Sequence, residues 1–396
     1  MTKLIDITGK VVSGEWGSDD ELGSGIPVLR TTNFTNEGVV NFDNVVTRTI
    51  TKKNISEKYL RCGDIIIEKS GGSDNQPVGR VIYYDGPENT YLFNNFTGLL
   101  RVQNKNKWLP RYIFYSLFSN YRKGGTRKFE NKTTGLHNLK TDDYVAKYEV
   151  TDAEYPMQVK VCNSLDKIAK IIEKRKQQLS ALDDLIKARF VEMFGDPEYN
   201  NKSWSIQTLD RLCSIGSSKR IYQNEQTSWG IPFWRISDLV SKMDNGFVNS
   251  NLFISEKKYD ELKQSGLVPV ANDILVTSRG TLGRCYIVKE EDSFYFQDGM
   301  ISWLSNYSEM ITPLYLQYLF MMSGFRKQID NMQAGSTIAY LSIAMLKKLK
   351  VMVPSKELQS DFSNFVSQVD NTKANIQKSL EKSQLLFDSL MQEYFG

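Results

Sequence analysis

Histidine is nearly absent from this chain of 396 residues, which carries only His137. Metal sites built on two histidines are therefore excluded, and a Ser-His-Asp or Cys-His relay would depend on that single residue. His137 lies in a predicted loop, where we expect a contact or surface role. Cysteine is also scarce, and its four copies form no C-x-x-C pair, which argues against a zinc cluster and a disulfide framework. These structural thiols are Cys62, Cys162, Cys213 and Cys285.

Long hydrophobic runs and nucleotide-binding motifs are missing as well. The longest apolar stretch, residues 315–322, is interrupted by Gln317 and is too short to span a bilayer. The N-terminus has no signal-peptide core, so we expect a cytoplasmic protein without a membrane partner. No G-x-x-x-x-G-K-S/T motif is present, and no G-x-G-x-x-G follows a predicted strand. We therefore expect no metal, no cofactor and no small-molecule substrate.

An excess of charge of one sign is the third absence. The chain has 50 Lys and Arg against 46 Asp and Glu, a net charge of +4. A nucleic-acid surface would have to come from local clusters of basic residues and not from bulk charge. Hydrophobic residues make up 40% of the chain and aromatic residues 12%, which is ample for packed cores. The length fits two or three domains.

The chain does contain an apolar stripe with heptad spacing, and it contains this stripe twice. Steps of three and four residues predict a coiled-coil seam on one long helix. Arg175 and Arg189 fill gaps in the first stripe, whereas Lys373 and Ser383 interrupt the second. The first stripe consists of Leu165, Ile168, Ile172, Leu179, Leu182, Ile186 and Met193, and the second, 201 residues later, of Val366, Val369, Ile376, Leu380, Phe387, Leu390 and Tyr394.

The length of the stripes predicts how the two helices pack. Each stripe spans 29 residues, so each helix should be about 45 Å long and too exposed to stand alone. The first helix leads into the second globular segment and the second returns from it, which favours an antiparallel pair. The alternative is that each helix belongs to the core of its own domain, although core helices usually have about 8–20 residues.

The segments before and between these helices share a series of landmarks, so the chain contains a nearly full-length internal repeat. The matched pairs are residues 25–30 with 230–235, residues 63–67 with 272–276, and the proline-initiated helices Pro110–Arg122 with Pro313–Lys327. We expect an α+β fold in which two similar mixed α/β domains, residues 1–155 and 196–354, are separated by two long helices. These helices, residues 156–195 and 355–396, should form an antiparallel coiled coil with a pseudo-two-fold internal repeat.

Polar loops recur at equivalent places in both repeats. Their Arg, Lys, Ser, Thr, Asn and Gln side chains are the types that contact phosphates and base edges, although any one such loop is also a normal solvated loop. The candidate contacts in the first repeat are Arg30, Thr31, Thr32, Asn33, Lys69, Arg80, Asn94, Asn95, Arg127, Lys132, Thr133 and Thr134. Those in the second are Arg235, Ser237, Asp238, Ser278, Arg279, Thr281, Arg284, Gln297, Ser336, Thr337 and Tyr340.

One acidic run in the first repeat resembles the strand of a metal-dependent nuclease. Asp64 and Glu68 are spaced like cation ligands, with Lys69 beside them. The second repeat has threonine and serine at the last two of these positions, so a pair of metal sites is not maintained. We therefore expect Asp64 and its counterpart Asp273 to be turn residues.

Taken together, the motifs resemble the specificity subunit of Type I restriction-modification enzymes, over the whole chain. The carriers are the run Phe190–Pro197 followed by Trp204 and Leu209, Gly230-Ile231-Pro232 with Arg235, Asn272–Leu275 with Arg279–Arg284, and the polar loop Gly335–Thr337. The first repeat departs from this pattern in its longer loop, Lys69–Gly79, and in Lys132–Asn138.

The resemblance implies a non-catalytic subunit. Each globular segment would be a target-recognition domain that reads one part of a split double-stranded DNA target. The long helices would fix the gap between the two parts and dock two methyltransferase subunits, through which restriction subunits join. Two alternatives stay open: a coiled-coil scaffold that binds only protein, and an enzyme with an unrecognised site such as a metal-dependent nuclease.

Overall fold

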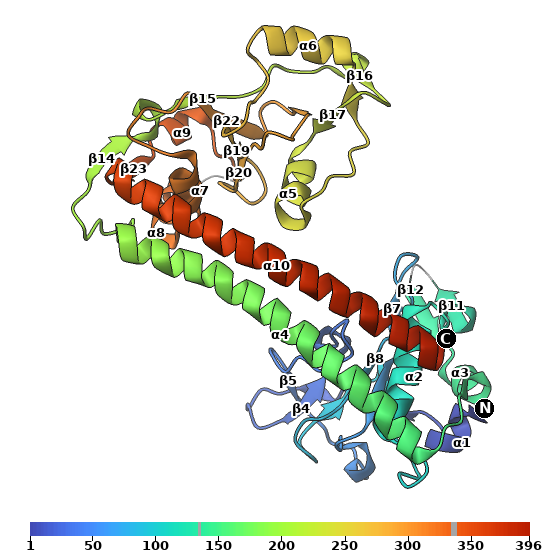
Figure 1. Cartoon of the computed structure of the whole chain (residues 1–396). Coiled ribbons are helices and arrows are strands. Elements are labelled where there is room, and N and C mark those ends of the chain that lie inside the picture. Colours follow the sequence, from blue (N-terminus) through green and yellow to red (C-terminus); the bar gives the residue numbers. More distant parts are fainter. Residues whose placement is uncertain (134–135, 334–338) are drawn as a thin grey trace. The chain divides into compact units, whose positions relative to one another are not determined.

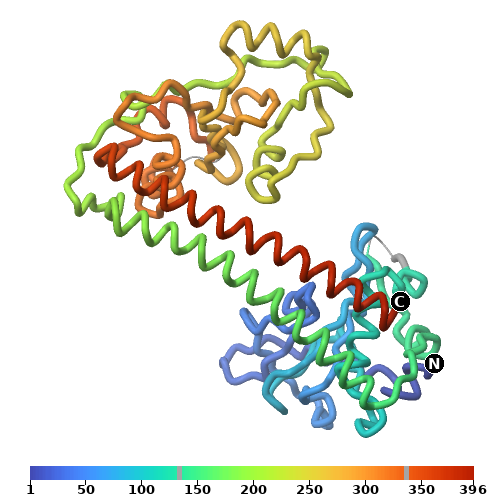
Figure 2. Tube along the Cα trace, viewed as in Figure 1, coloured from blue at the N-terminus to red at the C-terminus, as the bar shows by residue number. Residues whose placement is uncertain are grey.

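The computed structural model describes the chain except for residues 134–135 and 334–338 (Figure 1, Figure 2). The chain divides into two compact units. Unit 1 comprises Met1–Lys176 and Lys378–Gly396, and unit 2 comprises Gln177–Gln377. Each unit therefore holds one globular segment and part of each of two long helices. Among the described residues, no helix is long and apolar enough to cross a membrane.

The two long helices are α4 (Tyr155–Phe194) and α10 (Lys356–Phe395), each of 40 residues. At about 1.5 Å per residue each is roughly 60 Å long, so the predicted length of about 45 Å was too short. The apolar stripe marks only the part of each helix that faces its partner. The first turns instead pack on the globular segments through polar residues, which a hydrophobic pattern cannot reveal.

Contacts inside each unit show that α4 and α10 run antiparallel, as predicted. In unit 1, Leu165 of α4 shares a buried cluster with Phe387 and Met391, near the end of α10. In unit 2, Phe190 near the end of α4 packs its ring 5.5 Å from that of Phe362, near the start of α10. The twelve predicted seam residues from Leu165 to Ile186 and from Val366 to Leu390 are all buried or half-buried.

Polar residues in the seam find partners across it. The Arg175 guanidinium of α4 donates to the backbone oxygen of Ser379 and to the hydroxyl of Ser383 on α10, both within unit 1. In unit 2, the Lys373 ammonium pairs with Asp183. Two of the interrupting residues, Arg175 and Ser383, are thus complementary, and together with the pair of Lys373 and Asp183 they favour one register of the helix pair.

Two glutamines that the apolar pattern did not predict attach the long helices to their globular segments. Gln158 and Gln359 are 201 residues apart, the same offset as the stripes, and both are 0% exposed. The Gln158 amide accepts from the Leu109 N–H and donates to the oxygens of Lys107 and Ala153. A buried amide that satisfies three backbone groups fixes the start of α4 on the loop before the earlier helix, Pro110–Arg122.

In unit 1 two four-stranded sheets carry the core. The first is antiparallel, with the order β2 (Val12–Ser13), β10 (Thr97–Leu100), β6 (Ile65–Glu68) and β8 (Val81–Tyr83). The second has the order β3 (Ser18–Asp19), β5 (Val46–Thr49), β4 (Ile26–Leu29) and β9 (Leu92–Phe93), with β4 and β9 parallel. The β-branched run Ile65–Ile67 is buried on both faces, which makes β6 a central strand.

Unit 2 repeats this topology strand for strand. Its antiparallel sheet has the order β15 (Ser214–Gly216), β22 (Ile301–Ser305), β19 (Ile274–Thr277) and β20 (Cys285–Ile287). Its second sheet has the order β16 (Gln226–Thr227), β18 (Phe253–Ile254), β17 (Ile231–Trp234) and β21 (Tyr295–Phe296), with β17 and β21 parallel. The predicted α+β fold with an internal repeat and two long packed helices is therefore confirmed.

The remaining elements are short. Unit 1 adds the pair β1 (Thr2–Lys3) and β13 (Glu149–Val150), the sheet β11 (Glu130–Thr133), β12 (Leu136–Leu139) and β7 (Ser70–Gly72), the helices α1 (Leu4–Thr8), α2 (Pro110–Arg122) and α3 (Thr141–Lys147), and the 3-10 turns η1 (Thr31–Asn33), η2 (Ser56–Lys58) and η3 (Arg127–Phe129). Unit 2 adds the pair β14 (Ser205–Thr208) and β23 (Lys350–Val353), the helices α5 (Ile236–Asn245), α6 (Glu256–Gln264), α7 (Pro313–Met321), α8 (Ser323–Gln333) and α9 (Ile343–Lys347), and the turns η4 (Leu209–Arg211) and η5 (Gln223–Glu225).

One predicted helix is two helices. The prediction ran from Pro313 to Lys327, but α7 ends at an extended Met322 (ψ 135°) and α8 starts directly after it. A Cβ on Gly324 would lie 2.6 Å from the backbone nitrogen of Glu198. The backbone of α8 therefore approaches the loop after α4 closely, which a continuation of α7 would not allow.

Candidate functional site

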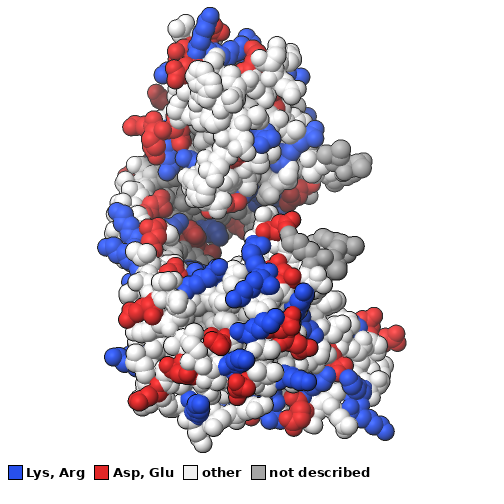
Figure 3. Space-filling model, turned by 90° about the vertical axis from the view of Figure 1, so that its right-hand side faces the viewer, with Lys and Arg blue, Asp and Glu red and all other residues white. Residues whose placement is uncertain are grey.

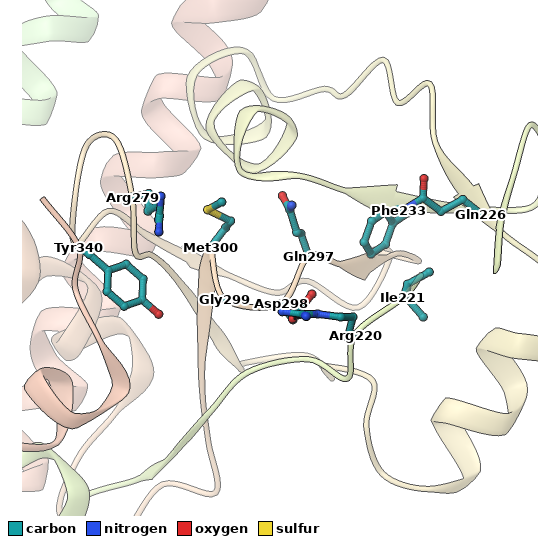
Figure 4. A pocket seen from close by; sticks show the side chains of 10 residues that line it. All are labelled: Arg220, Ile221, Gln226, Phe233, Arg279, Gln297, Asp298, Gly299, Met300 and Tyr340. Atoms are coloured by element: carbon teal, nitrogen blue, oxygen red, sulfur yellow. Dashed lines mark hydrogen bonds and ion pairs between the residues drawn. The ribbon is translucent and has the colours of Figure 1, made fainter. Parts of the chain in front are cut away.

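A hollow of about 540 Å³ in unit 2 brings together residues from four parts of its sequence (Figure 4). Three of the predicted site residues line it: Arg279, Gln297 and Tyr340. The other lining residues are Arg220, Ile221, Gln226, Phe233, Asp298, Gly299 and Met300. The predicted loops after β19 and β21 thus converge with the segment before α9.

The loop that carries Arg279 is closed by hydrogen bonds to the last residue of β19. The Thr277 oxygen accepts from the Gly283 N–H at 2.8 Å, and its hydroxyl accepts from the Arg284 N–H at 3.0 Å. Gly280 and Gly283 have φ values of 67° and 70°, a left-handed conformation that favours glycine. Arg279 is therefore presented by a fixed turn and not by a loose loop.

The hollow contains two guanidinium groups, one in an ion pair and one without an ion pair to any described residue. The Arg220 Nε donates to the Asp298 carboxylate at 2.8 Å. The Arg279 guanidinium lies 5.3 Å from the centre of the Tyr340 ring, a cation–π contact, and makes no hydrogen bond or ion pair with any described residue. The side-chain amide of Gln297 also has no hydrogen-bond partner in the part of the chain that the structure describes. The backbone N–H of Gln297 donates to the backbone oxygen of Trp234. Arg279 and Gln297 therefore offer donors that no described residue engages, and Met300 lies between the two side chains (Figure 4).

The other predicted residues of unit 2 lie outside the hollow. Arg284 is paired with Asp244. Asp238 accepts from the Arg235 N–H and caps α5, and Ser278 is buried with its hydroxyl 2.8 Å from that of Ser302. Arg235, Ser237 and Thr281 are exposed. Ser336 and Thr337 lie outside the described residues.

In unit 1, several predicted residues lie beneath the surface. Arg80 donates to the oxygens of Thr31 and Phe34 at 2.9 and 3.1 Å and lies 3.5 Å from Glu68. Asn33 is 2% exposed, and its amide donates to the Asn41 oxygen. Asn94 is likewise buried. Arg80 and Asn33 hold the loops in shape from below through these bonds. Asn33 and Asn94 are buried and Arg80 is half-buried, so none of the three is presented at the surface like Arg279.

Other predicted residues of unit 1 remain at the surface. Thr32, Asn95 and Arg127 are exposed, and Thr31, Arg30 and Lys69 are half-buried. The Lys69 ammonium donates to the Ser13 hydroxyl at 2.7 Å. The Arg30 guanidinium donates to the Asn44 oxygen, and that of Arg127 to the Asp74 oxygen. Lys132 and Thr133 belong to β11, and Thr134 lies outside the described residues.

Both carboxylates of the nuclease-like run of unit 1 pair with arginine side chains, Asp64 with Arg101 and Glu68 with Arg80. Asp64 accepts from the Arg101 guanidinium at 2.7 Å with both carboxylate oxygens, and also from the Arg61 N–H, which makes it the predicted turn residue. Burial raises the pKa of Glu68, against the opposing effect of Arg80. Among the described residues, no group of three His, Cys, Asp or Glu side chains could hold a metal ion.

His137 lies in a strand and not in the predicted loop, and of the expected contact or surface role only the contact role fits its burial. It belongs to β12 and is 3% exposed. One ring nitrogen, Nδ1, lies 2.8 Å from the Glu130 carboxylate, which also accepts from the Val78 N–H. The histidine is therefore part of the packing between β12 and the loop after β7.

Comparisons with known proteins agree with these observations. Residues 201–383 match the family model of the Type I restriction modification DNA specificity domain. This part of the chain belongs to the family of Type I restriction modification DNA specificity domains. Its family resemblance is therefore confirmed, and a specificity subunit is a non-catalytic subunit. The chain is 28% identical over 201 residues to a putative type I restriction enzyme specificity subunit of Haemophilus influenzae, covering 48% of this chain and 49% of that protein.

Two solved structures and a second relative extend the likeness along the specificity subunit. The chain is 22% identical over 353 residues to the MjaVIII type I restriction enzyme specificity subunit of Methanocaldococcus jannaschii, with 80% and 79% of the chains covered. It superposes on the crystal structure of the S subunit of the Type-I restriction-modification system from M. genitalium with a TM-score of 0.56 at 17% identity, covering 100% of this chain and 95% of that one. A second solved structure, from work on complex assembly and conformational transition of the type I R-M system, gives a TM-score of 0.56 at 12% identity. The match covers 100% of this chain and 96% of that one. At these identities the structures establish the fold alone.

Sequence reasoning missed residues at the surface of the specificity subunit. Arg220 and Gln226 line the hollow of unit 2 but lie in segments without a matched landmark in unit 1. Phe96 follows two predicted residues, Asn94 and Asn95, and is 55% exposed. Aromatic residues are usually assigned to a core, so only the structure separates this ring from the buried Phe93.

Proposed function

We propose that this specificity subunit reads a bipartite double-stranded DNA target in the cytoplasm, one part with each unit. The long helices set the gap between the two parts and dock two methyltransferase subunits, through which restriction subunits join. The similarity to two Type I restriction enzyme specificity subunits supports the restriction-modification role. Residues 1–155 and 196–354 are the proposed target-recognition domains, and residues 156–195 and 355–396 the spacer helices.

The observation that carries the proposal is a scaffold used twice with different side chains at its loops. The backbone hydrogen bond from Asn94 to Leu29 in unit 1 has its counterpart from Gln297 to Trp234 in unit 2. The bond from Lys69 to Phe96 has its counterpart from Ser278 to Met300. Equivalent backbone with different side chains is what two readers of different sequences require.

The surface charge agrees with recognition by local groups. Basic and acidic side chains are mixed over the face shown in Figure 3, as the net charge of +4 requires. Attraction to DNA would then come from individual loops. In unit 2 we assign this role to Arg279 and Gln297, because arginine pairs with guanine O6 and N7 and glutamine with adenine N6 and N7 in the major groove.

Exchange of one unit tests the division of labour. Residues 196–354 are replaced by the equivalent segment of a relative with a different target, and the methylated positions are sequenced in cells that also carry the methyltransferase partner. One half of the methylated motif should change and the other should stay. A simultaneous change of both halves would contradict independent reading, and retention of both would contradict reading by this segment.

Arg279 is tested against its neighbour in the same loop. Arg279→Ala should cost about 1–3 kcal/mol of binding to the target and relax one base position. Arg284→Ala is the matched control, because the Arg284 guanidinium is already paired with Asp244. Binding is measured by titration of labelled duplexes at several salt concentrations.

The salt series distinguishes the kind of contact. A weakening that is uniform across sequences and lowers the salt slope by about 0.9 would make Arg279 a phosphate contact. Binding and specificity unchanged by Arg279→Ala would remove this residue from the interface.

A further inference from the structure

The turn between β9 and β10 in unit 1 presents a phenylalanine to solvent. The Thr97 N–H and hydroxyl both donate to the Asn94 oxygen, at 3.1 and 2.9 Å, which closes a four-residue turn. Asn95 and Phe96 occupy its two central positions, and both are exposed. The Phe96 ring makes no ring contact with another described aromatic residue. Its side chain is therefore directed away from the core.

The backbone on both sides of Phe96 is fixed. Its oxygen accepts from the Lys69 N–H at 2.8 Å, and the Asn94 N–H donates to the Leu29 oxygen at 3.0 Å. The turn is thus tied to the ends of β6 and β4, two strands of the core. A rigid turn loses little conformational entropy when its side chain meets a ligand.

The same position in unit 2 belongs to the candidate site. The Met300 oxygen accepts from the Ser278 N–H at 2.9 Å, the counterpart of the bond between Phe96 and Lys69. Met300 is half-buried and lines the hollow beside Arg279. A single exposed apolar residue is common on proteins, but this one lies at the position equivalent to Met300, beside the candidate donors of unit 2.

We propose that Phe96 contacts the 5-methyl group of a thymine in the part of the target that unit 1 reads. This inference rests on the proposed function and adds a specificity-determining residue to it. Thymine presents the only methyl group among the four bases in the major groove, and phenylalanine is one of the side chains that contact it. Unit 1 would recognise by an apolar contact at the position equivalent to Met300, which in unit 2 lies between the hydrogen-bond donors Arg279 and Gln297.

Removal of the methyl group alone tests the contact. The target is first identified from the methylated positions, and each thymine of the duplex is then replaced by uracil, one at a time. For the full chain co-expressed with its methyltransferase partner, one replacement should weaken binding about fourfold, the worth of one buried methyl group. In Phe96→Ala the same replacement should have no further effect, whereas Phe96→Leu should keep part of it.

The control is an exposed apolar residue of the same unit. Leu22 is 89% exposed, and Leu22→Ala should leave both the affinity and the uracil effect unchanged. The inference is overturned if the target part read by unit 1 has no thymine, or if the uracil effect persists in Phe96→Ala. If Phe96→Ala bound the target more weakly but kept the full uracil effect, the Phe96 ring would instead insert between bases or stack on one.

The proposed function fails separately. In that case the unchanged chain would bind its methylated motif no better than a scrambled duplex of the same length. If the chain bound its motif specifically but the uracil effect did not depend on Phe96, only the assignment of Phe96 would be overturned.

Discussion

Gln359 should contribute more to the stability of unit 2 than any surface glutamine of that unit. Its amide oxygen accepts from the Thr312 N–H at 2.8 Å and from the Thr312 hydroxyl at 3.1 Å. Its amide nitrogen donates to the oxygens of Met310 and Pro354 at 2.9 and 3.0 Å. Gln359→Ala leaves these groups without their partner and opens a cavity. Each unsatisfied buried group costs about 1–3 kcal/mol. Because a single substitution rarely costs more than about 5 kcal/mol in total, we expect a loss of about 3–5 kcal/mol, near the lower end of the sum over the four groups.

The matched control is Gln328, which makes the same kinds of bond at the surface. Its amide donates to the Lys350 oxygen at 3.1 Å and accepts from the Lys350 N–H at 3.0 Å, and both residues border solvent. Water can replace these bonds in Gln328→Ala, so the loss should stay below about 1 kcal/mol. The two variants therefore differ in burial and not in chemistry.

Hydrogen exchange measured by mass spectrometry on the full chain resolves the two units. The slowest amides of unit 2 should exchange roughly 10²–10⁴-fold faster in Gln359→Ala, which is 3–5 kcal/mol at 1.36 kcal/mol per tenfold. Gln158→Ala should have the same effect on unit 1. If Gln359→Ala were no more harmful than Gln328→Ala, the buried glutamines would not anchor the helices.

Two further predictions concern pH and spacing. Burial raises the pKa of Asp273 above 3.8, so its contribution to stability is complete below that value and is lost as pH rises through the raised pKa. Urea unfolding across this range should show the loss, and Asp273→Asn should abolish it. Insertion of one heptad into each long helix, after Ser180 and after Ile376, lengthens the pair by about 10 Å, or about three base pairs. The methylated motif should then have a gap about three pairs longer, or specific binding should be lost because the second reader also turns about 100° around the duplex. If the gap and the affinity were unchanged, the helices would not set the spacing and would serve only to dock the partner subunits.

The helix pair could be predicted from the sequence because burial of apolar residues leaves a periodic trace. The stripes that start at Leu165 and Val366 specify two helices, and the chain order between them favours antiparallel pairing. Gln158 and Gln359 leave no such trace, since a polar residue near a helix start normally lies in solvent. Their offset of 201 residues was present in the sequence, but only the hydrogen bonds show that it has a physical meaning.

The loops were predictable in position and less so in orientation. Arg279 and Arg80 are both basic residues in loops beside a central strand, yet one is free at a hollow and the other donates to Thr31 and Phe34 from below. Residue type specifies the groups that a side chain offers. The direction of that side chain depends on partners elsewhere in the chain, such as Glu68 beside Arg80.

The division between scaffold and loops gives the specificity subunit a physical route to new targets. The turn at Phe96 and its counterpart at Met300 are held by the same backbone hydrogen bonds, from Lys69 and Ser278, which do not depend on side-chain identity. A substitution at an exposed position such as Phe96 therefore changes the surface that DNA meets without removing a bond that supports the fold. Arg80 lacks this freedom, because its guanidinium is itself the support of the neighbouring turn. Change of specificity should accordingly be confined to the exposed tips, with the buried polar residues beneath them held constant.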